Sequence, residues 1–157
     1  DLSLDLKRER AYRARMVGTR RKAKRGEVSR ERILQVALEL FTQKGYVGAG
    51  VDHVASRAKI AKTAIYYHFG NKEGLLSAVL ERLASEWIEG IRTVSTGVHG
   101  PIERLDRVLA RMRSLVEERP WISKLYQLMA LEVAEEKPEI RNTLQVTSAR
   151  AVDAFTE

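Results

Sequence analysis

The fold is decided by residues 51–73, which read VDHVASRAKIAKTAIYYHFGNKE. Apolar residues at helical spacing predict one short helix over residues 51–58 and a second over residues 62–69. Residues 59–61 interrupt the pattern between them. Two short helices joined by about three residues form a helix-turn-helix, whose second member is short enough to lie in a DNA major groove. The stretch therefore predicts a DNA-reading element.

The outward side chains of the second predicted helix are nearly all hydrogen-bond donors. Lys62 and Thr63 lie at its N-terminal end, where side chains of helix-turn-helix proteins reach base edges. Lysine donates to guanine O6 and N7, and threonine bonds bases or touches a thymine methyl. We therefore predict that Lys62 and Thr63 read bases.

Composition predicts an all-α protein. Of the 157 residues, 44% are hydrophobic and 31% are charged, as in soluble globular proteins, and apolar residues fall at helical spacing almost everywhere. The chain has no cysteine, which excludes disulfides and thiolate metal sites. No apolar run approaches the roughly 18 residues of a membrane span, and the N-terminus lacks the apolar core of a signal peptide. We expect a cytoplasmic protein that makes no membrane contact.

Charge is distributed unevenly along the chain. Residues 1–72 hold 17 Lys and Arg against 7 Asp and Glu, a net charge of +10, whereas residues 73–157 have a net charge of −3. This asymmetry indicates a polyanionic partner for the N-terminal half. We interpret residues 1–28 as a basic N-terminal arm. It is either a solvated tail or a segment that adds phosphate or minor-groove contacts on bound DNA.

A wider stretch resembles the DNA-binding domain of TetR-family transcriptional regulators. Residues 29–79 contain ILxxALELFxxKGY, VxxVAxRA, IYYHF and NKEGLL in the family's order and spacing. The resemblance implies a three-helix DNA-binding domain over residues 29–73, followed by a helical ligand-binding and dimerisation domain over residues 74–157. It also implies a homodimer that places two helix-turn-helix units on a pseudo-palindromic operator. The chain stops at Glu157, and we expect the last two helices of the family's dimer interface to be missing.

The resemblance also assigns phosphate contacts and shows departures from the family's pattern. Tyr66, Tyr67, His68 and Lys72 would mainly hold phosphates, which sets register without reading sequence. Packing against the first helix is the alternative for Tyr66, and a capping or surface role is the alternative for His68. The departures from the family's usual residues are Lys59 for Gly in the turn, Ala61 for a Ser or Thr N-cap, and Gly50 and Ala64 for polar residues.

Helical periodicity continues on both sides of the helix-turn-helix. Ser29 is expected to cap a first helix that Gly45 ends. The later helices are predicted from an Asn71 cap onward, from Pro101 to Pro120, over residues 121–133 and over residues 139–157. The predicted buried stripe of the helix after Pro101 consists of Ile102, Leu105, Val108, Leu109, Met112, Leu115 and Val116.

By the resemblance, the second half should hold a pocket for a small hydrophobic ligand. The candidate lining residues are Trp87, Met112, Trp121, Leu125, Tyr126 and Met129, with His99, Tyr126 or Gln127 as polar groups. The alternative for each of them is an ordinary place in the helical core.

No arrangement of residues indicates catalysis, a metal or a cofactor. The three histidines are dispersed, HxxxH and HExxH are absent, and so is the phosphate-binding pattern GxxxxGK[ST]. Together with the resemblance, which implies a sequence-specific, ligand-responsive repressor that binds operator DNA as a homodimer, this leads us to predict that the protein is not an enzyme. The alternatives are a sequence-tolerant, nucleoid-type DNA-binding protein without small-molecule control, and an enzyme that carries a DNA-binding-like domain.

Overall fold

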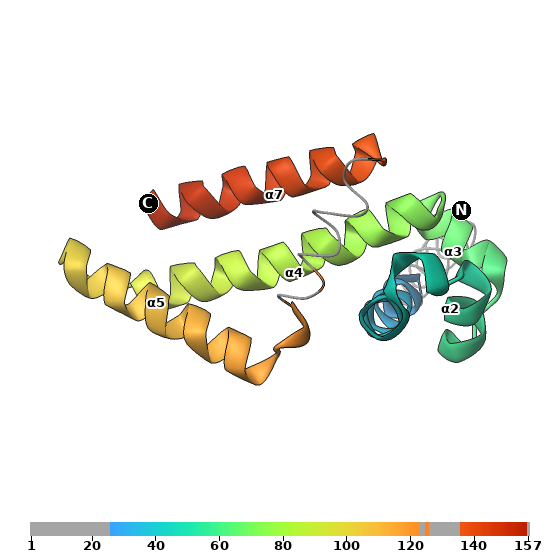
Figure 1. Ribbon diagram of the computed structural model, residues 1–157, viewed down its shortest axis with the longest axis horizontal. Helices are drawn as coiled ribbons and strands as arrows, with labels where there is room; N and C mark the ends of the chain where they lie inside the picture. The colour runs from blue at the N-terminus through green and yellow to red at the C-terminus, as the bar shows by residue number, and fades with distance from the viewer. Residues whose placement is uncertain (1–25, 123–124, 126–135, 157) are drawn as a thin grey trace, which may run out of the picture.

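The computed structural model describes residues 26–122, 125 and 136–156. All regular secondary structure within these residues is α-helical, which confirms the predicted all-α class (Figure 1). The helices are a first helix over residues 26–48, α2 (Val51–Ala58), α3 (Lys62–Phe69), α4 (Lys72–Ser95), α5 (Pro101–Glu118) and α7 (Pro138–Thr156). Most of the basic N-terminal arm and most of the helix predicted over residues 121–133 lie outside the described residues.

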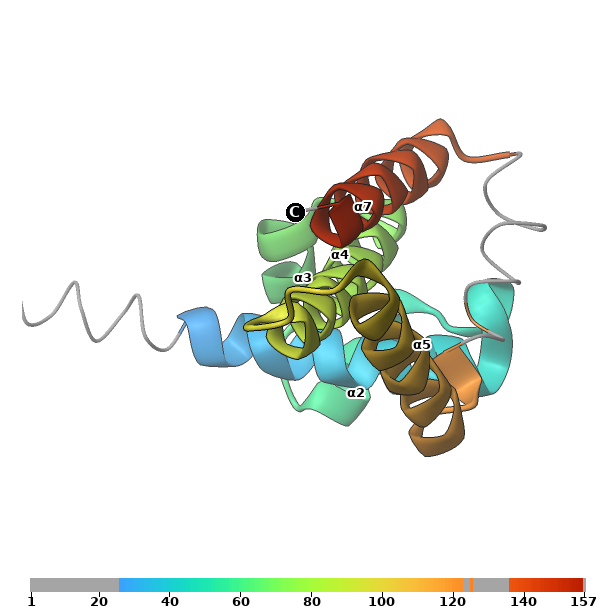
Figure 2. The same cartoon turned by 90° about the vertical axis from the view of Figure 1, so that its left-hand side faces the viewer.

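Helix α4 is the axis around which the other elements are arranged. The first helix, α2 and α3 gather at the N-terminal end of α4 and form a head (Figure 1). Helix α7 runs along α4 in the same direction, so that its first residues lie near the head, and α5 crosses α4 on another side. Figure 2, viewed at right angles, shows α5 and α7 on different sides of α4. Helix α4 thus connects the head with the second half of the chain.

Local signals determine where most helices begin and end. The Asn71 side chain accepts a hydrogen bond of 2.6 Å from the Gly74 amide, which caps α4 as predicted. Pro101 occupies the first turn of α5, and that helix ends before Pro120. The predicted Ser29 cap is wrong, because residues 26–28 are already helical. The surrounding Glu and Arg residues are good helix formers, and nothing in this segment stops the helix.

The apolar core is continuous between the head and the second half. Buried side chains of the first helix, α2 and α3, among them Phe41, Val54 and Ile65, form one cluster with the first three turns of α4. Leu125 and Ile140 belong to the same cluster and are also buried. The head therefore shares its core with residues far along the chain.

The predicted buried stripe of α5 is largely wrong. Only Val108 is buried, Leu115 is half-buried, and Ile102 is 76% exposed. The other exposed members of the stripe are Leu105, Leu109, Met112 and Val116. The spacing of apolar residues shows which face of a helix is apolar but not which neighbour covers it. Within the described residues, α5 packs chiefly on α4, and much of its apolar face is left uncovered.

Candidate DNA interface

Helix α2 and a tight turn fix the position of α3. Val54, Ala55 and Ala58 bury one face of α2, and the turn that follows has Lys59 in the left-handed conformation, with φ 55° and ψ 48°. This conformation costs a residue with a Cβ roughly 1–2 kcal/mol, which explains why glycine is usual there. The Ile60 amide donates to the Ala55 carbonyl at 3.1 Å and closes the turn. As expected from the sequence, neither α2 nor α3 has a side-chain N-cap bond.

Helix α3 has one buried side and one exposed side. Ile65 is fully buried, whereas Lys62, Thr63, Tyr66 and Tyr67 are exposed. We call these four exposed residues the α3 face. Tyr67 is 86% exposed, although an aromatic ring gains from burial, so this ring is available to a partner. His68 is half-buried between Tyr67 and Phe69, with ring centroids 5.2 and 5.9 Å away.

The ammonium group of Lys62 already has a partner in α2. Its Nζ lies 2.8 Å from Asp52 Oδ1 and 5.9 Å from the centroid of the Tyr66 ring. The bond to Asp52 raises the pKa of Lys62, so the side chain is cationic at neutral pH. Both groups are exposed, and water screens the pair, so a DNA phosphate or base edge can compete for the lysine. Asp52 was not predicted from the sequence as part of the site.

Lys72 is held against the first helix. Its Nζ lies 4.4 Å from the centroid of the Tyr46 ring and 3.4 Å from the Val47 carbonyl oxygen. Partial burial lowers the pKa of Lys72, and the Glu73 carboxylate opposes this shift. Tyr46 is also missing from the sequence-predicted site, although the KGY motif that contains it supports the resemblance. Its contact with Lys72 depends on the tertiary fold.

Further polar contacts tie the head together. Arg57 of α2 forms an ion pair of 2.9 Å with Glu39 of the first helix and also donates to Gln43. The guanidinium of Arg30 lies 5.4 Å from the centroid of the Phe69 ring at the end of α3. These contacts link the first helix to both α2 and α3, which fixes the orientation of the α3 face.

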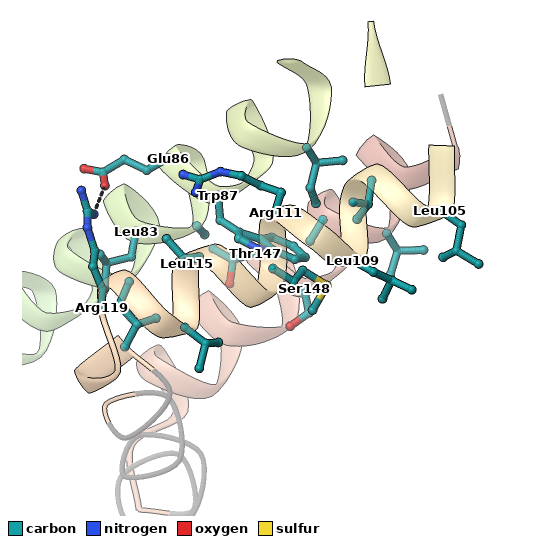
Figure 3. A pocket seen from close by; sticks show the side chains of 18 residues that line it. Leu83, Glu86, Trp87, Leu105, Leu109, Arg111, Leu115, Arg119, Thr147 and Ser148 are labelled. Carbon is teal, nitrogen blue, oxygen red and sulfur yellow. Dashed lines mark hydrogen bonds and ion pairs between the residues drawn. The ribbon is translucent and has the colours of Figure 1, made fainter. Parts of the chain in front are cut away.

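A groove opens between α4, α5 and α7 in the second half (Figure 3). Its volume is about 660 Å³, within the range of small-molecule sites. The lining is mostly apolar and includes two of the predicted residues, Trp87 and Met112. Figure 3 shows Trp87 among side chains of α5 and α7, with the ion pair between Glu86 and Arg119, 3.1 Å long, at one end.

The other predicted pocket residues lie elsewhere. Leu125 is buried in the shared core, and Trp121 packs against that core. Tyr126 and Met129 lie outside the described residues, as does Gln127. The residues of α7 that line the groove, Thr147, Ser148, Ala151 and Val152, were not predicted from the sequence. The spacing of apolar residues along α7 does not show that this helix lines a groove together with α4 and α5.

The part of the chain that the structure describes offers neither a candidate metal site nor a candidate membrane span. There, no group of three or more His, Asp or Glu side chains lies close enough together to hold a metal ion. None of the helices described has both the length and the apolarity needed to cross a membrane.

Helices α2 and α3 with the turn between them have the geometry of a helix-turn-helix. Residues 33–79 match the family described as "Bacterial regulatory proteins, tetR family". The chain is 28% identical over 125 residues to the HTH-type transcriptional activator FasR of Mycolicibacterium smegmatis, covering 80% of this chain and 56% of FasR. It is 28% identical over 89 residues to the HTH-type transcriptional repressor NicS of Pseudomonas putida, covering 57% of this chain and 42% of NicS.

The fold is also similar to a solved structure with a bound ligand. The transcriptional regulator FadR from Bacillus subtilis, in complex with stearoyl-CoA, superimposes with a TM-score of 0.69 at 22% identity, covering 79% of this chain and 65% of FadR. Residues 33–79 thus carry a DNA-binding domain of the TetR-family type. The chain spans about half the length of the curated relatives it matches.

Proposed function

We propose that this chain is a sequence-specific transcriptional regulator that inserts α3 into the major groove of operator DNA. The observation that carries the proposal is the two-sided character of α3, with Ile65 buried and the α3 face open to solvent. Lys62 and Thr63 occupy the N-terminal end of α3, from which helix-turn-helix proteins contact base edges. In this proposal they read the sequence.

The remaining predicted residues hold the DNA backbone in this proposal. Tyr66 and Tyr67 are exposed on α3, and Lys72 is the first residue of α4, next to backbone amides that also attract phosphate. His68 lies in the last turn of α3. Contacts from these four residues to phosphates would fix the register of α3 on the duplex without selecting a sequence.

The regulator acts in the cytoplasm as a homodimer on a pseudo-palindromic operator. We assign DNA binding to residues 29–73 and regulation to residues 74–157. The match of residues 33–79 to the family supports this division, since two identical heads reading neighbouring major grooves require a two-fold related site. The shared core supports a mechanical connection between the two parts, because a movement of α4 reaches both.

We further propose that the groove takes an elongated hydrophobic ligand whose binding releases DNA. The apolar lining and the volume of the groove support this, as does the fold similarity to FadR, which was solved with stearoyl-CoA. For repression to be relieved, the ligand must bind the DNA-incompetent form more tightly. A tenfold loss of DNA affinity requires about 1.4 kcal/mol of differential binding.

Selection of bound sequences from random duplex DNA tests the proposed DNA reading. We expect a pseudo-palindromic consensus that the protein binds at least about 10³-fold more tightly than a scrambled duplex. A steep salt dependence with no preferred sequence would instead identify a sequence-tolerant DNA-binding protein.

Tryptophan fluorescence tests the proposed groove. The chain has two tryptophans, so Trp121→Phe leaves Trp87 as the reporter inside the groove. Titration with stearoyl-CoA should change the Trp87 emission and lower the affinity for the selected duplex. Ala151→Phe, which adds a ring to the groove wall, should weaken both effects. Unchanged emission and unchanged DNA affinity would contradict the ligand proposal without affecting DNA reading.

A further inference from the structure

The start of α7 touches the first turn of α4 beside Lys72. Lys137, which directly precedes α7, places its Nζ 2.9 Å from Glu73 Oε1. Burial, and after it the neighbouring Glu73 carboxylate, raise the pKa of the Tyr46 hydroxyl. The Lys72 Nζ lies 4.4 Å from the centroid of the Tyr46 ring. Lys137, Glu73, Tyr46 and Lys72 thus lie next to one another, with Lys137 paired to Glu73 and the Lys72 ammonium on the Tyr46 ring.

We propose that Lys137 is a positioning residue that orients Lys72 for a DNA phosphate through Glu73 and Tyr46. The inference rests on the proposed DNA binding, because it needs Lys72 to contact the duplex backbone. It assigns Lys137, Glu73 and Tyr46 a part in DNA affinity although only Lys72 would touch the DNA. We call these four residues the relay.

The physical reason is competition for the Lys72 ammonium. Glu73 is the next residue in the chain, and an unpaired carboxylate there would attract Lys72 and repel an approaching phosphate. Lys137 pairs with that carboxylate at 2.9 Å, and this bond is the main cause that lowers the pKa of Glu73. Lys72 is then left on the Tyr46 ring, with the Val47 carbonyl as its other partner.

The relay also connects the head with the groove. Helix α7 begins one residue after Lys137, and Thr147, Ser148 and Ala151 of the same helix line the groove. Because α7 lies along α4, a shift of α7 relative to α4 changes the distance between Lys137 and Glu73. The orientation of Lys72 therefore depends on where α7 sits.

Salt-dependent binding to the selected duplex tests the inference in the full chain. Lys72→Ala should lower the slope of log Kobs against log salt by about one and weaken binding to all duplexes alike. Lys137→Met should reproduce much of both effects. Lys137→Arg keeps the positive charge, so its salt slope and affinity should stay close to those of the wild-type chain. In the Lys72→Ala background, Lys137→Met should cause no further loss, because both substitutions remove the same contact.

A matched control separates positioning from a simple loss of positive charge. Arg107→Met also removes one cation from a surface ion pair, the 2.8 Å pair with Glu103 within α5. It should leave the salt slope nearly unchanged. Glu73→Gln provides a second variant on the relay: it removes the competing carboxylate, so in the Glu73→Gln background Lys137→Met should no longer weaken binding.

Two results would overturn the inference. Equal effects of Lys137→Met and Arg107→Met would show that only net charge matters. Additive losses in the Lys72→Ala, Lys137→Met double variant would show that Lys137 acts independently of Lys72. In both cases the wild-type chain still prefers its selected duplex, so the proposed function stands. Absence of any duplex binding by the wild-type chain would overturn both proposals.

Discussion

The Lys62 ammonium of α3 lies 2.8 Å from the Asp52 carboxylate of α2, so the residue that we propose as a base reader already has a partner in the protein without DNA. This pair restricts a long, flexible side chain to one region of the α3 face. It also puts a negative charge close to where DNA phosphates would approach. The pair therefore opposes binding to an arbitrary duplex, while a guanine in the right place can still accept from Lys62.

Replacing Lys62 by alanine should damage sequence reading more than general DNA binding. We expect Lys62→Ala to cost about 1–3 kcal/mol on the selected duplex and to relax the base preference at the contacted position. Binding constants measured on the selected and on scrambled duplexes check this, with Lys44→Ala as a control that removes an exposed lysine from the first helix. An equal loss on all sequences would contradict base reading by Lys62.

Replacing Asp52 by asparagine should have a different effect. Asp52→Asn removes the negative charge and frees Lys62, so the affinity for scrambled duplexes should rise while the preference for the selected duplex falls. The same pair of binding measurements checks this expectation. The change in preference should disappear in a Lys62→Ala background, and its persistence there would show that Asp52 does not act through Lys62.

Gly74 is required by the close approach of α3 and α4. A Cβ built on Gly74 would lie 2.1 Å from the Phe69 carbonyl oxygen, which belongs to the backbone and has little freedom to move. Gly74→Ala should therefore lower the free energy of unfolding by about 1–3 kcal/mol. Urea denaturation measures this value.

Gly90 offers a control for Gly74 within the same helix. A Cβ there would have only ordinary contact, 3.4 Å, with the end of the flexible Arg111 side chain. Because alanine is favoured over glycine inside a helix, Gly90→Ala should instead raise the free energy of unfolding by about 0.5–1 kcal/mol. Similar effects of the two substitutions would contradict the role assigned to Gly74.

The contacts of Glu73 should make stability depend on pH at the acid side. Lys137 lowers the pKa of Glu73 in the folded chain, so the stabilisation is complete above the unfolded pKa of about 4.3 and is lost as the pH falls through the folded value. The wild-type chain should therefore be more stable than Glu73→Gln at pH 7, and this difference should shrink towards pH 3. Urea denaturation across that range checks it, and a constant difference would contradict the expectation.

Local features of the sequence were sufficient to place most helices of the head. The predicted bounds of α2 and α3 agree with the structure because the apolar spacing and the interrupting residues 59–61 both act within a few residues. The Asn71 cap and the two prolines around α5 are equally local. The turn has Lys59 in the left-handed conformation, at the position where the resemblance leads one to expect glycine.

Contacts between distant parts of the chain were beyond sequence reasoning. Asp52, Tyr46 and Lys137 gain their places beside Lys62, Lys72 and Glu73 only through tertiary packing. The prediction for α5 failed for the same reason, since its apolar stripe is well defined but the described residues supply little to cover it. The groove likewise is lined by Trp87 and Met112, which were predicted, and by residues of α7, which the apolar spacing did not predict.

The common core that includes Phe41, Leu125 and Ile140 has a consequence for chimeric regulators. Exchanging heads between TetR-like proteins by joining the chains at residue 73 would separate Phe41 and the rest of the head from the α4, Leu125 and Ile140 side chains of the same cluster. A transplanted head would expose apolar surface to solvent unless the second half of the recipient protein offered side chains of matching shape. Grafting only the exposed side chains of the α3 face onto a related protein would leave that core intact.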